Sequence, residues 1–432
     1  MSSGTGVGTE STRHDRLPVR TLVAASIGNA IEWYDWTIYA TFTIYFANQF
    51  YPSDSPGIAV IKTSATYALA FFFRPLGGWL LGRFADIRGR KPAMLLTILL
   101  MAGGSAAIGL LPTYEMVGWL APVLLTLARI AQGISLGGEV SNASAYLAEI
   151  APPTRRGRFS SFFYISTGAS LLIASLLGAL LANTLSKAQL ESFGWRIPFL
   201  IGGVLALIGL WLRTTLTETE QFEQNKEKAA AVRWPLMVTL REHPKAVAQL
   251  VGFTMLSTLC YYTFFAALTP FAVNTRKADA GDVFIALSIG TVLFIALQYP
   301  FGVLSDRVGR KPPMLVWCAG IALLIVPLSY LVRPGVLNLT VVFCVGLGLY
   351  SLLSSIAPAI MSELFPTELR GIGIGAWYNI TVATFGGTAP LVIASLAEAG
   401  YGMAFFYYVA VGAVIAFLVV LTLPETAGSE LH

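Results

Sequence analysis

Twelve long apolar runs, separated by shorter polar segments, make up most of the chain. They lie at residues 20–46, 58–82, 93–111, 119–148, 159–184, 196–213, 246–272, 283–303, 312–332, 338–361, 371–397 and 402–423. Most reach or exceed the ~20 residues that a helix needs to cross about 30 Å of hydrocarbon, and the shortest come close to it. The pattern therefore predicts twelve transmembrane helices.

The composition supports a membrane protein. Hydrophobic residues make up 55% of the 432 residues, charged residues make up 12%, and the mean hydropathy is +0.69. Soluble domains carry about 25% charged residues. Only helices and closed barrels satisfy their backbone groups in lipid, and the runs lack the alternating strands of a barrel. We therefore expect an all-α polytopic membrane protein.

The longest polar segment divides the runs into two sets of six. It follows the sixth run and contains TETEQFEQNKEKAAAVRW. The N-terminal segment is too polar for a signal peptide and is expected to be a disordered tail. The predicted organisation is a cytoplasmic tail at 1–19, a six-helix bundle at 20–213, a cytoplasmic loop at 214–245, a six-helix bundle at 246–423 and a cytoplasmic tail at 424–432.

The basic residues predict the orientation of the spans. With both termini in the cytoplasm, 20 of the 28 lysines and arginines fall in cytoplasmic segments and 4 on the opposite side. This is the positive-inside distribution. It also explains the net charge of +5, so we expect no nucleic-acid partner.

A charged decapeptide interrupts the apolar pattern twice. GRFADIRGRK at 82–91 returns as GVLSDRVGRK at 302–311, and AEIAPPTRRGR at 148–158 is echoed by SELFPTELRGI at 362–372. Homologous halves are typical of transporters built from repeats. We expect these loops to meet only while the cytoplasmic side is closed. The gating candidates are Gly82, Asp86, Gly89, Arg90, Glu149, Arg156, Asp306, Arg310, Glu363 and Arg370.

Two of these candidates carry specific expectations. Asp86 is expected to contact either the N-terminal end of a helix in the other half or the side chain of Arg156. Gly82 and Gly89 are expected to permit a close approach of the backbone.

Chemistry other than transport has little support in the sequence. Cys260, Cys318 and Cys344 have neither paired spacing nor a nearby histidine, so we expect no metal site and no disulfide framework. The glycine-rich stretches lack the Lys–Ser/Thr ending of a P-loop. We expect no enzymatic activity and no cofactor, and energy must come from an ion gradient or from the substrate gradient.

The charged decapeptides resemble the signature loop of the major facilitator superfamily, and RIAQG at 129–133 resembles another of its motifs. GNAIEWYDWTIYATF, FFRPLGGWLLGRFAD, ARIAQGISLGGE, YLAEIAPPTRRG and FGWRIPF resemble its metabolite:H⁺ symporter family. LCYYTF, VNT and TFGGTA are most similar to the bacterial α-ketoglutarate permeases. The resemblance implies the major facilitator fold of two six-helix bundles in a bacterial cytoplasmic (inner) membrane. The first decapeptide departs from the superfamily pattern at Ile87, where a basic residue is usual.

Two acidic residues lie inside the first apolar run, where an ionisable side chain is costly and usually functional. Glu32 and Asp35 share one helical face with Trp36 and Tyr39. A carboxyl poised between burial and a nearby arginine can bind and release a proton near neutral pH. We interpret Glu32 and Asp35 as proton-coupling candidates and Tyr39 as a substrate contact. The alternative is a carboxylate pair that only holds helices together.

Arg129, in the fourth run, is the expected partner of Asp35. The resemblance implies that the first and fourth helices are neighbours, and such a pair is similar to the coupling pair of proton-linked sugar porters. Gln132 and Glu139 share one face of the fourth helix. We name Arg129 and Glu139 as proton-coupling candidates and Gln132 as a substrate contact. The alternative for Arg129 is a structural role.

Two arginines are candidate ligands for an anionic substrate. Arg74 lies twelve residues before Asp86, which places it about 18 Å deeper in the membrane, and a buried guanidinium is a good clamp for a carboxylate. The alternative is an ion pair with Glu32 or Asp35. Arg196, at the outer end of the sixth run, is either a second carboxylate ligand or an interfacial residue that extends to the membrane surface.

The seventh and eleventh runs supply neutral candidates. Tyr262, Tyr378 and Asn379 are able to hydrogen-bond a ketone or a carboxylate. Each is named as a substrate contact, and the alternative for each is packing.

These features predict an importer of a dicarboxylate such as α-ketoglutarate, working by H⁺ symport and alternating access. Citrate, shikimate or a zwitterion such as betaine or proline remain alternative substrates, and an uncoupled uniporter, an exporter, a channel or a receptor remain alternative functions. The residues do not distinguish H⁺ from Na⁺. The expected partners are a small organic anion and the lipid bilayer, and the expected assembly is a monomer.

Overall fold

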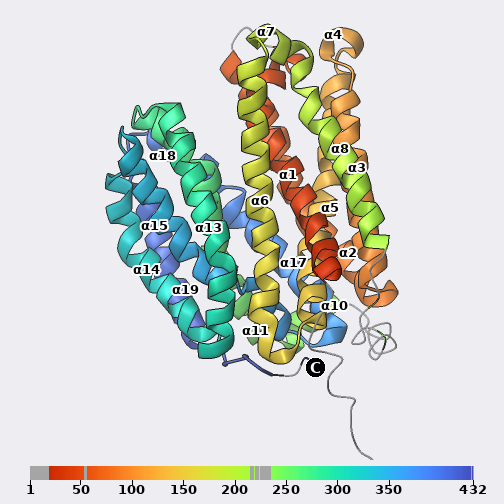
Figure 1. The fold of residues 1–432 in the computed structure, drawn as a ribbon, viewed down its shortest axis with the longest axis vertical. Helices are drawn as coiled ribbons and strands as arrows, with labels where there is room; N and C mark the ends of the chain where they lie inside the picture. Colours follow the sequence, from red (N-terminus) through yellow and green to blue (C-terminus); the bar gives the residue numbers. More distant parts are fainter. Residues whose placement is uncertain are drawn as a thin grey trace, which may run out of the picture.

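A computed structural model of the chain describes residues 19–52, 56–214, 218, 223, 235–429 and 431. The regular structure of these residues is helical, without a strand (Figure 1). The expected N-terminal tail and most of the expected central loop lie outside the described residues.

The first half of the chain forms six long helices. They are α1 (Val19–Phe50), α2 (Pro56–Arg88), α3 (Arg90–Leu110), α5 (Leu120–Ile150), α6 (Arg156–Thr184) and α8 (Arg196–Thr214). The short helices α4 (Tyr114–Val117) and α7 (Lys187–Gln189) join them at the upper end of the molecule in Figure 1.

The second half repeats this plan with more interruptions. Its elements are α10 (Pro235–Glu242), α11 (Pro244–Tyr262), α12 (Leu268–Pro270), α13 (Ala280–Val308), α14 (Lys311–Tyr330), α15 (Val336–Ser354), α16 (Ala357–Glu363), α17 (Thr367–Thr381), α18 (Ala389–Glu398) and α19 (Ala404–Leu421). The π-helical segments η3 (Thr263–Ala267) and η5 (Val382–Gly386) follow α11 and α17 directly. Such widened turns occur frequently at functional sites.

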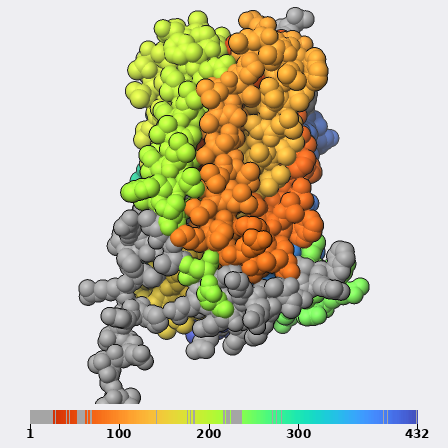
Figure 2. Space-filling model, turned by 90° about the vertical axis from the view of Figure 1, so that its right-hand side faces the viewer, coloured from red at the N-terminus to blue at the C-terminus, as the bar shows by residue number. Residues whose placement is uncertain are grey.

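The structure has the twelve membrane-spanning helices that the apolar runs predict. Ten described segments are long and apolar enough to cross a membrane, and α1 and α2, which include side chains outside the described set, supply the other two. Many large apolar side chains are exposed on the outside of the bundle. Such surfaces are rare on soluble proteins and are typical of contact with lipid. Figure 2 shows one such face, where α3 lies beside α8. Val204, Leu207 and Trp211 of α8 are exposed.

Two helix pairs make the most extensive contacts between the halves. Helix α2 packs against α17, and α6 packs against α13. Glycines make both crossings close, because a Cβ on Gly82 would lie 2.7 Å from the Gly371 carbonyl oxygen, and one on Gly157 would lie 2.6 Å from that of Gly302. Gly82 therefore permits the close approach expected of it.

Both decapeptides lie at the lower end of Figure 1, which we call the charged face. Each turns at a glycine with positive φ, Gly89 (φ 113°) between α2 and α3 and Gly309 (φ 97°) between α13 and α14. This backbone conformation disfavours any residue with a Cβ. A Cβ at Gly89 would also lie 2.2 Å from a carboxylate oxygen of Glu218, so that side chain would have to move.

Candidate functional site

Arg74 lies fully buried in α2, where the two halves meet. Its Nε donates to Asn379 Oδ1 at 3.2 Å, and its Nη1 donates to the Tyr262 hydroxyl at 3.3 Å. The guanidinium carbon also lies 5.4 Å from the ring centroid of Phe71. Among the described residues Arg74 forms no ion pair, and its Nη2 has no hydrogen-bond partner. The alternative of an ion pair with Glu32 or Asp35 is therefore not present.

Asn379 is held so that its oxygen faces Arg74. Its Nδ2 donates to the carbonyl of Gly137 in α5 at 2.8 Å and to that of Gly375 at 2.6 Å. The amide thus crosses between the halves twice, once to a backbone oxygen and once to a cation. The π-helical segments begin at Thr263 and Val382, within one turn of Tyr262 and Asn379.

Aromatic rings from both halves surround this cation. The Phe71 ring centroid lies 5.5 Å from that of Tyr262 and 5.0 Å from that of Trp36. Trp33 lies 5.0 Å from Tyr261 of the second half. Tyr378 is half-buried and packs against the same cluster. Sequence reasoning did not name Trp33 as a site residue, because an aromatic residue in an apolar helix carries no signal of its own.

Gln132 stands between Asp35 and Arg129. It accepts a hydrogen bond from Arg129 Nη1 at 2.6 Å and donates to Asp35 Oδ2, while Ser105 donates to Asp35 Oδ1. The guanidinium carbon of Arg129 lies 4.2 Å from the ring centroids of both Trp36 and Tyr39. Asp35 and Arg129, two of the predicted coupling residues, thus come together with Gln132 as a bridge inside the first half.

Glu139 has its partners on two other helices. It pairs with Arg213 of α8 and accepts from Thr97 Oγ1 at 2.7 Å. Arg213 is fully buried. Glu139 follows Gln132 by two turns, or about 10 Å along the helix. It therefore pairs with Arg213 of α8 and not with Arg129 of its own helix.

Arg196 acts on the backbone of α3. Its Nη1 donates to the carbonyls of Gly109 and Leu111 at 2.9 and 2.8 Å, and its guanidinium carbon lies 4.3 Å from the Trp195 ring centroid. These contacts satisfy carbonyls that the end of a helix leaves unpaired. They favour a structural role for Arg196 over a second carboxylate ligand.

A first cluster of charges closes the charged face around Asp86. Asp86 accepts from the amides of Gly371 and Ile372 in α17, each at 3.2 Å, and from Arg90 at 2.7 Å. Of the two expected partners, Asp86 thus meets the helix of the other half. Glu149 lies 2.8 Å from Arg370 and 3.3 Å from Arg90. The Glu149–Arg370 pair links the two halves.

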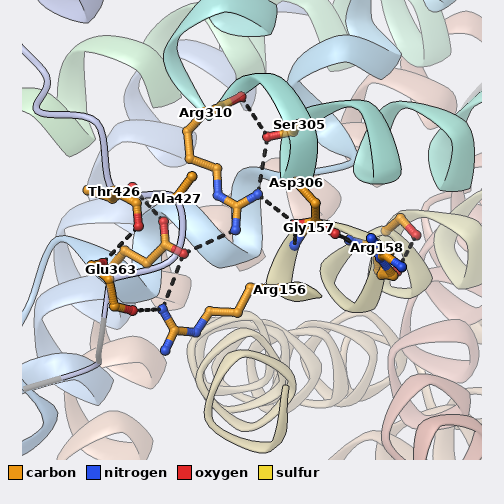
Figure 3. A network of polar contacts seen from close by, with 12 residues as sticks. Arg156, Gly157, Arg158, Ser305, Asp306, Arg310, Glu363, Thr426 and Ala427 are labelled. Atoms are coloured by element: carbon orange, nitrogen blue, oxygen red, sulfur yellow. Dashed lines mark hydrogen bonds and ion pairs between the residues drawn. The ribbon is translucent and has the colours of Figure 1, made fainter. Parts of the chain in front are cut away.

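A second cluster repeats this arrangement with the halves exchanged (Figure 3). Asp306 accepts from the amide of Gly157 at 2.8 Å and from Arg310 at 3.0 Å. Glu363 lies 3.4 Å from Arg310 and 3.5 Å from Arg156. Arg156 thus pairs with Glu363 rather than with Asp86. All gating candidates lie at this face, and in this structure the charged face is closed.

Two further carboxylates accept hydrogen bonds from backbone amides of the decapeptides. Glu218 accepts from the amides of Arg90 and Lys91, and Glu425 accepts from those of Arg310 and Lys311. Burial opposes ionisation of Glu425, but the amides of Arg310, Ala427 and Lys311 outweigh it and lower the pKa of this carboxyl. The sequence does contain a signal for both, since LTET at 216–219 resembles LPET at 423–426.

Comparison with known proteins agrees with this architecture. The Major Facilitator Superfamily matches residues 25–388 and 250–431. The chain is 39% identical over 411 residues to the alpha-ketoglutarate permease of Escherichia coli K12, covering 94% of each chain. It is 32% identical to a glycine betaine/proline/ectoine/pipecolic acid transporter of Dickeya dadantii, covering 95% of this chain and 84% of that one.

Solved structures show the same fold. A proton:xylose symporter bound to 6-bromo-6-deoxy-D-glucose superposes with a TM-score of 0.77 at 19% identity, covering 96% of this chain and 97% of that one. The twelve helices, the repeated charged loops and these matches lead to one conclusion. The chain belongs to the major facilitator superfamily.

Proposed function

We propose that the protein imports a dicarboxylate of the α-ketoglutarate type together with protons. The observation that carries this proposal is Arg74, a fully buried guanidinium between the halves with only neutral partners. A buried cation without a counter-ion is costly, and a substrate carboxylate would supply the missing charge with bidentate geometry. The likeness to an alpha-ketoglutarate permease supports the same substrate class.

The arrangement supports an alternating-access cycle around Arg74. The charged face, which we propose to be cytoplasmic in a bacterial inner membrane, is closed by two clusters, so substrate would enter from the opposite side. A carboxylate reaching Arg74 would compete with Asn379 and Tyr262, whose hydrogen bonds cross between the halves. Release of these bonds would let the two bundles rock.

Proton coupling would follow from the charge balance inside the first half. Away from the charged face, the buried acids described in this half are Glu32, Asp35 and Glu139, and the buried bases are Arg74, Arg129 and Arg213. An added substrate anion upsets this balance of three acids and three bases. Uptake of a proton by one of the acids would offset the added charge, which is the basis of symport proposed here.

A zwitterionic substrate such as betaine is the second candidate. Arg196 is engaged with backbone carbonyls, which leaves Arg74 as a single carboxylate ligand beside aromatic rings. Aromatic rings bind quaternary ammonium groups through cation–π attraction. The likeness to a transporter of betaine and proline supports this alternative.

Uptake into proteoliposomes tests the proposal. Labelled α-ketoglutarate should accumulate when the outside is acidic, and unlabelled succinate should compete better than betaine. Arg74→Lys should reduce uptake at least tenfold, because an ammonium lacks the fork of the guanidinium, whereas the matched variant Arg196→Ala should retain it. Accumulation of betaine without that of α-ketoglutarate would establish the second candidate instead.

A further inference from the structure

Glu32 differs in its hydrogen bonds from Asp35 and Glu139, the other two described acids that are buried in the first half away from the charged face. Asp35 accepts from Ser105 and Gln132, and Glu139 accepts from Arg213 and Thr97. The only hydrogen-bond partner of Glu32 among the described residues is Ser135, and its Oε2 has none. An ionised carboxylate held in this way, fully buried with one neutral contact, is strongly disfavoured.

The contacts of the Ser135 hydroxyl indicate whether Glu32 is protonated or ionised. Ser135 Oγ lies 2.8 Å from Glu32 Oε1 and 2.6 Å from the carbonyl oxygen of Thr97. A serine hydroxyl has one proton to donate, and a carbonyl can only accept. If that proton points to Thr97, the Glu32 contact is a hydrogen bond only when Glu32 itself donates. Both contacts are satisfied together only by a protonated Glu32.

Ser105 also contacts two acceptors, Asp35 and the carbonyl of Phe199 at 3.1 Å. Asp35 nevertheless has a second donor that Glu32 lacks. Arg129 donates to the Gln132 oxygen, which orients the amide so that its nitrogen donates to Asp35. This arrangement suits an ionised Asp35.

Charged groups from three helices act on Glu32. They are Glu139 of α5, Arg213 of α8 and Arg74 of α2, all close enough to interact with it electrostatically. Helix α3 contributes the Thr97 carbonyl through Ser135. The α6 side chains that hydrogen-bond to α1 in the described part of the chain are the hydroxyls of Ser166, Thr167 and Ser170. Arg213 is already engaged by Glu139, so Arg74 is the cation whose effect on Glu32 a substrate can change.

We infer that Glu32 carries the transported proton and that Arg74 links its protonation to substrate binding, an inference that rests on the proposed proton-coupled import. The proton is bound at Glu32 Oε1 and shared with Ser135 Oγ while the charged face is closed. A substrate carboxylate on Arg74 cancels the positive charge that favours ionised Glu32. Substrate binding therefore favours proton binding, and by linkage the proton favours the substrate equally.

Proton uptake by the purified transporter in weakly buffered detergent tests this assignment. In solution, molecules whose charged face is open are expected to carry an ionised Glu32. Addition of α-ketoglutarate at pH 7.5 should shift them to the closed state with a protonated Glu32 and so raise the pH of the wild-type solution, as read with an indicator dye. Glu32→Gln should reduce this signal at least tenfold, while Asp35→Asn should still take up protons. A full signal from Glu32→Gln, or its loss from Asp35→Asn alone, overturns the inference and assigns the proton to Asp35.

The same assay separates this inference from the proposed function. If the wild type binds and transports substrate without any proton signal, proton symport itself fails, whatever Glu32 does. A second measurement needs no variant, because dicyclohexylcarbodiimide modifies protonated carboxyls in apolar surroundings. Mass spectrometry of the wild type should locate the adduct on Glu32, with faster labelling in the presence of substrate. An adduct on Asp35 without one on Glu32 contradicts the inference.

Discussion

The substitution Glu149→Gln tests whether the charged face is held closed by its ion pairs. The Glu149 carboxylate is buried between Arg370 of the other half, at 2.8 Å, and Arg90 of its own half, at 3.3 Å. The glutamine has nearly the same shape but no charge. It leaves two guanidiniums in the closed state without their shared carboxylate, whereas water solvates them once the face opens.

The size of the effect follows from burial. Breaking one partner of a buried ion pair costs about 3–5 kcal/mol, and the closed state bears nearly all of this cost. Even the lower value, about 3 kcal/mol, lowers the ratio of closed to open molecules roughly a hundredfold. Glu363→Gln breaks the corresponding pair in the second cluster, so its effect should be similar.

The opening can be measured by double electron–electron resonance, which gives the distance between two spin labels. Spin labels at Arg88→Cys and Arg307→Cys, exposed positions on the charged face of either half, would be placed in a background without the three native cysteines. Glu149→Gln should move the distance distribution to longer values. Glu115→Gln, on exposed α4 at the opposite end (Figure 1), is the control. Unchanged distances in Glu149→Gln would refute the view that these pairs hold the face closed.

Three further predictions concern other parts of the fold. Arg196→Ala should retain uptake but lose about 1–3 kcal/mol of stability, because two helix-end carbonyls lose their donor; a normal melting temperature together with abolished uptake contradicts this. Gly82→Val should open the charged face, because its side chain would meet the Gly371 carbonyl, whereas Gly103→Val, with nothing within 4 Å, should not; equal label distances in both would contradict the crossing. Glu425→Gln should melt below the wild type at pH 7. Since the native pKa of Glu425 is lowered, its contribution is full above the unfolded value of about 4.3 and is lost as the pH falls further, so the two melting curves should converge there; a constant difference would contradict this.

The sequence predicted the helices and the depth of Arg74 because both depend on distance along one chain. The length of an apolar run is matched to the thickness of the membrane. A fixed rise per residue places Arg74 about 18 Å from Asp86 along the helix, toward the middle of the membrane. Tyr262 and Asn379 were named as candidates, but their meeting with Arg74 was not predicted. The contact of Arg74 with Asn379 depends on how α2 crosses α17, where glycines allow the two helices to approach closely.

The pairing of the buried charges was harder to predict. Helical periodicity places Glu139 on a face but does not choose between cations on neighbouring helices, and the structure pairs it with Arg213. The same holds for Gln132. The sequence of one helix predicted a substrate contact there, and in the structure Gln132 hydrogen-bonds to both Asp35 and Arg129. Pairing of this kind is a property of tertiary packing.

The positions of Glu218 and Glu425 in the chain have a consequence for the order in which the two halves fold. Glu218 follows the last helix of the first half and binds the amides that begin its third helix, and Glu425 does the same in the second half. Each half therefore completes its own charged turn only after its sixth span is in the membrane. During synthesis the first half can mature before the second emerges from the ribosome, as domains commonly do. Separately expressed halves should then associate into a working carrier.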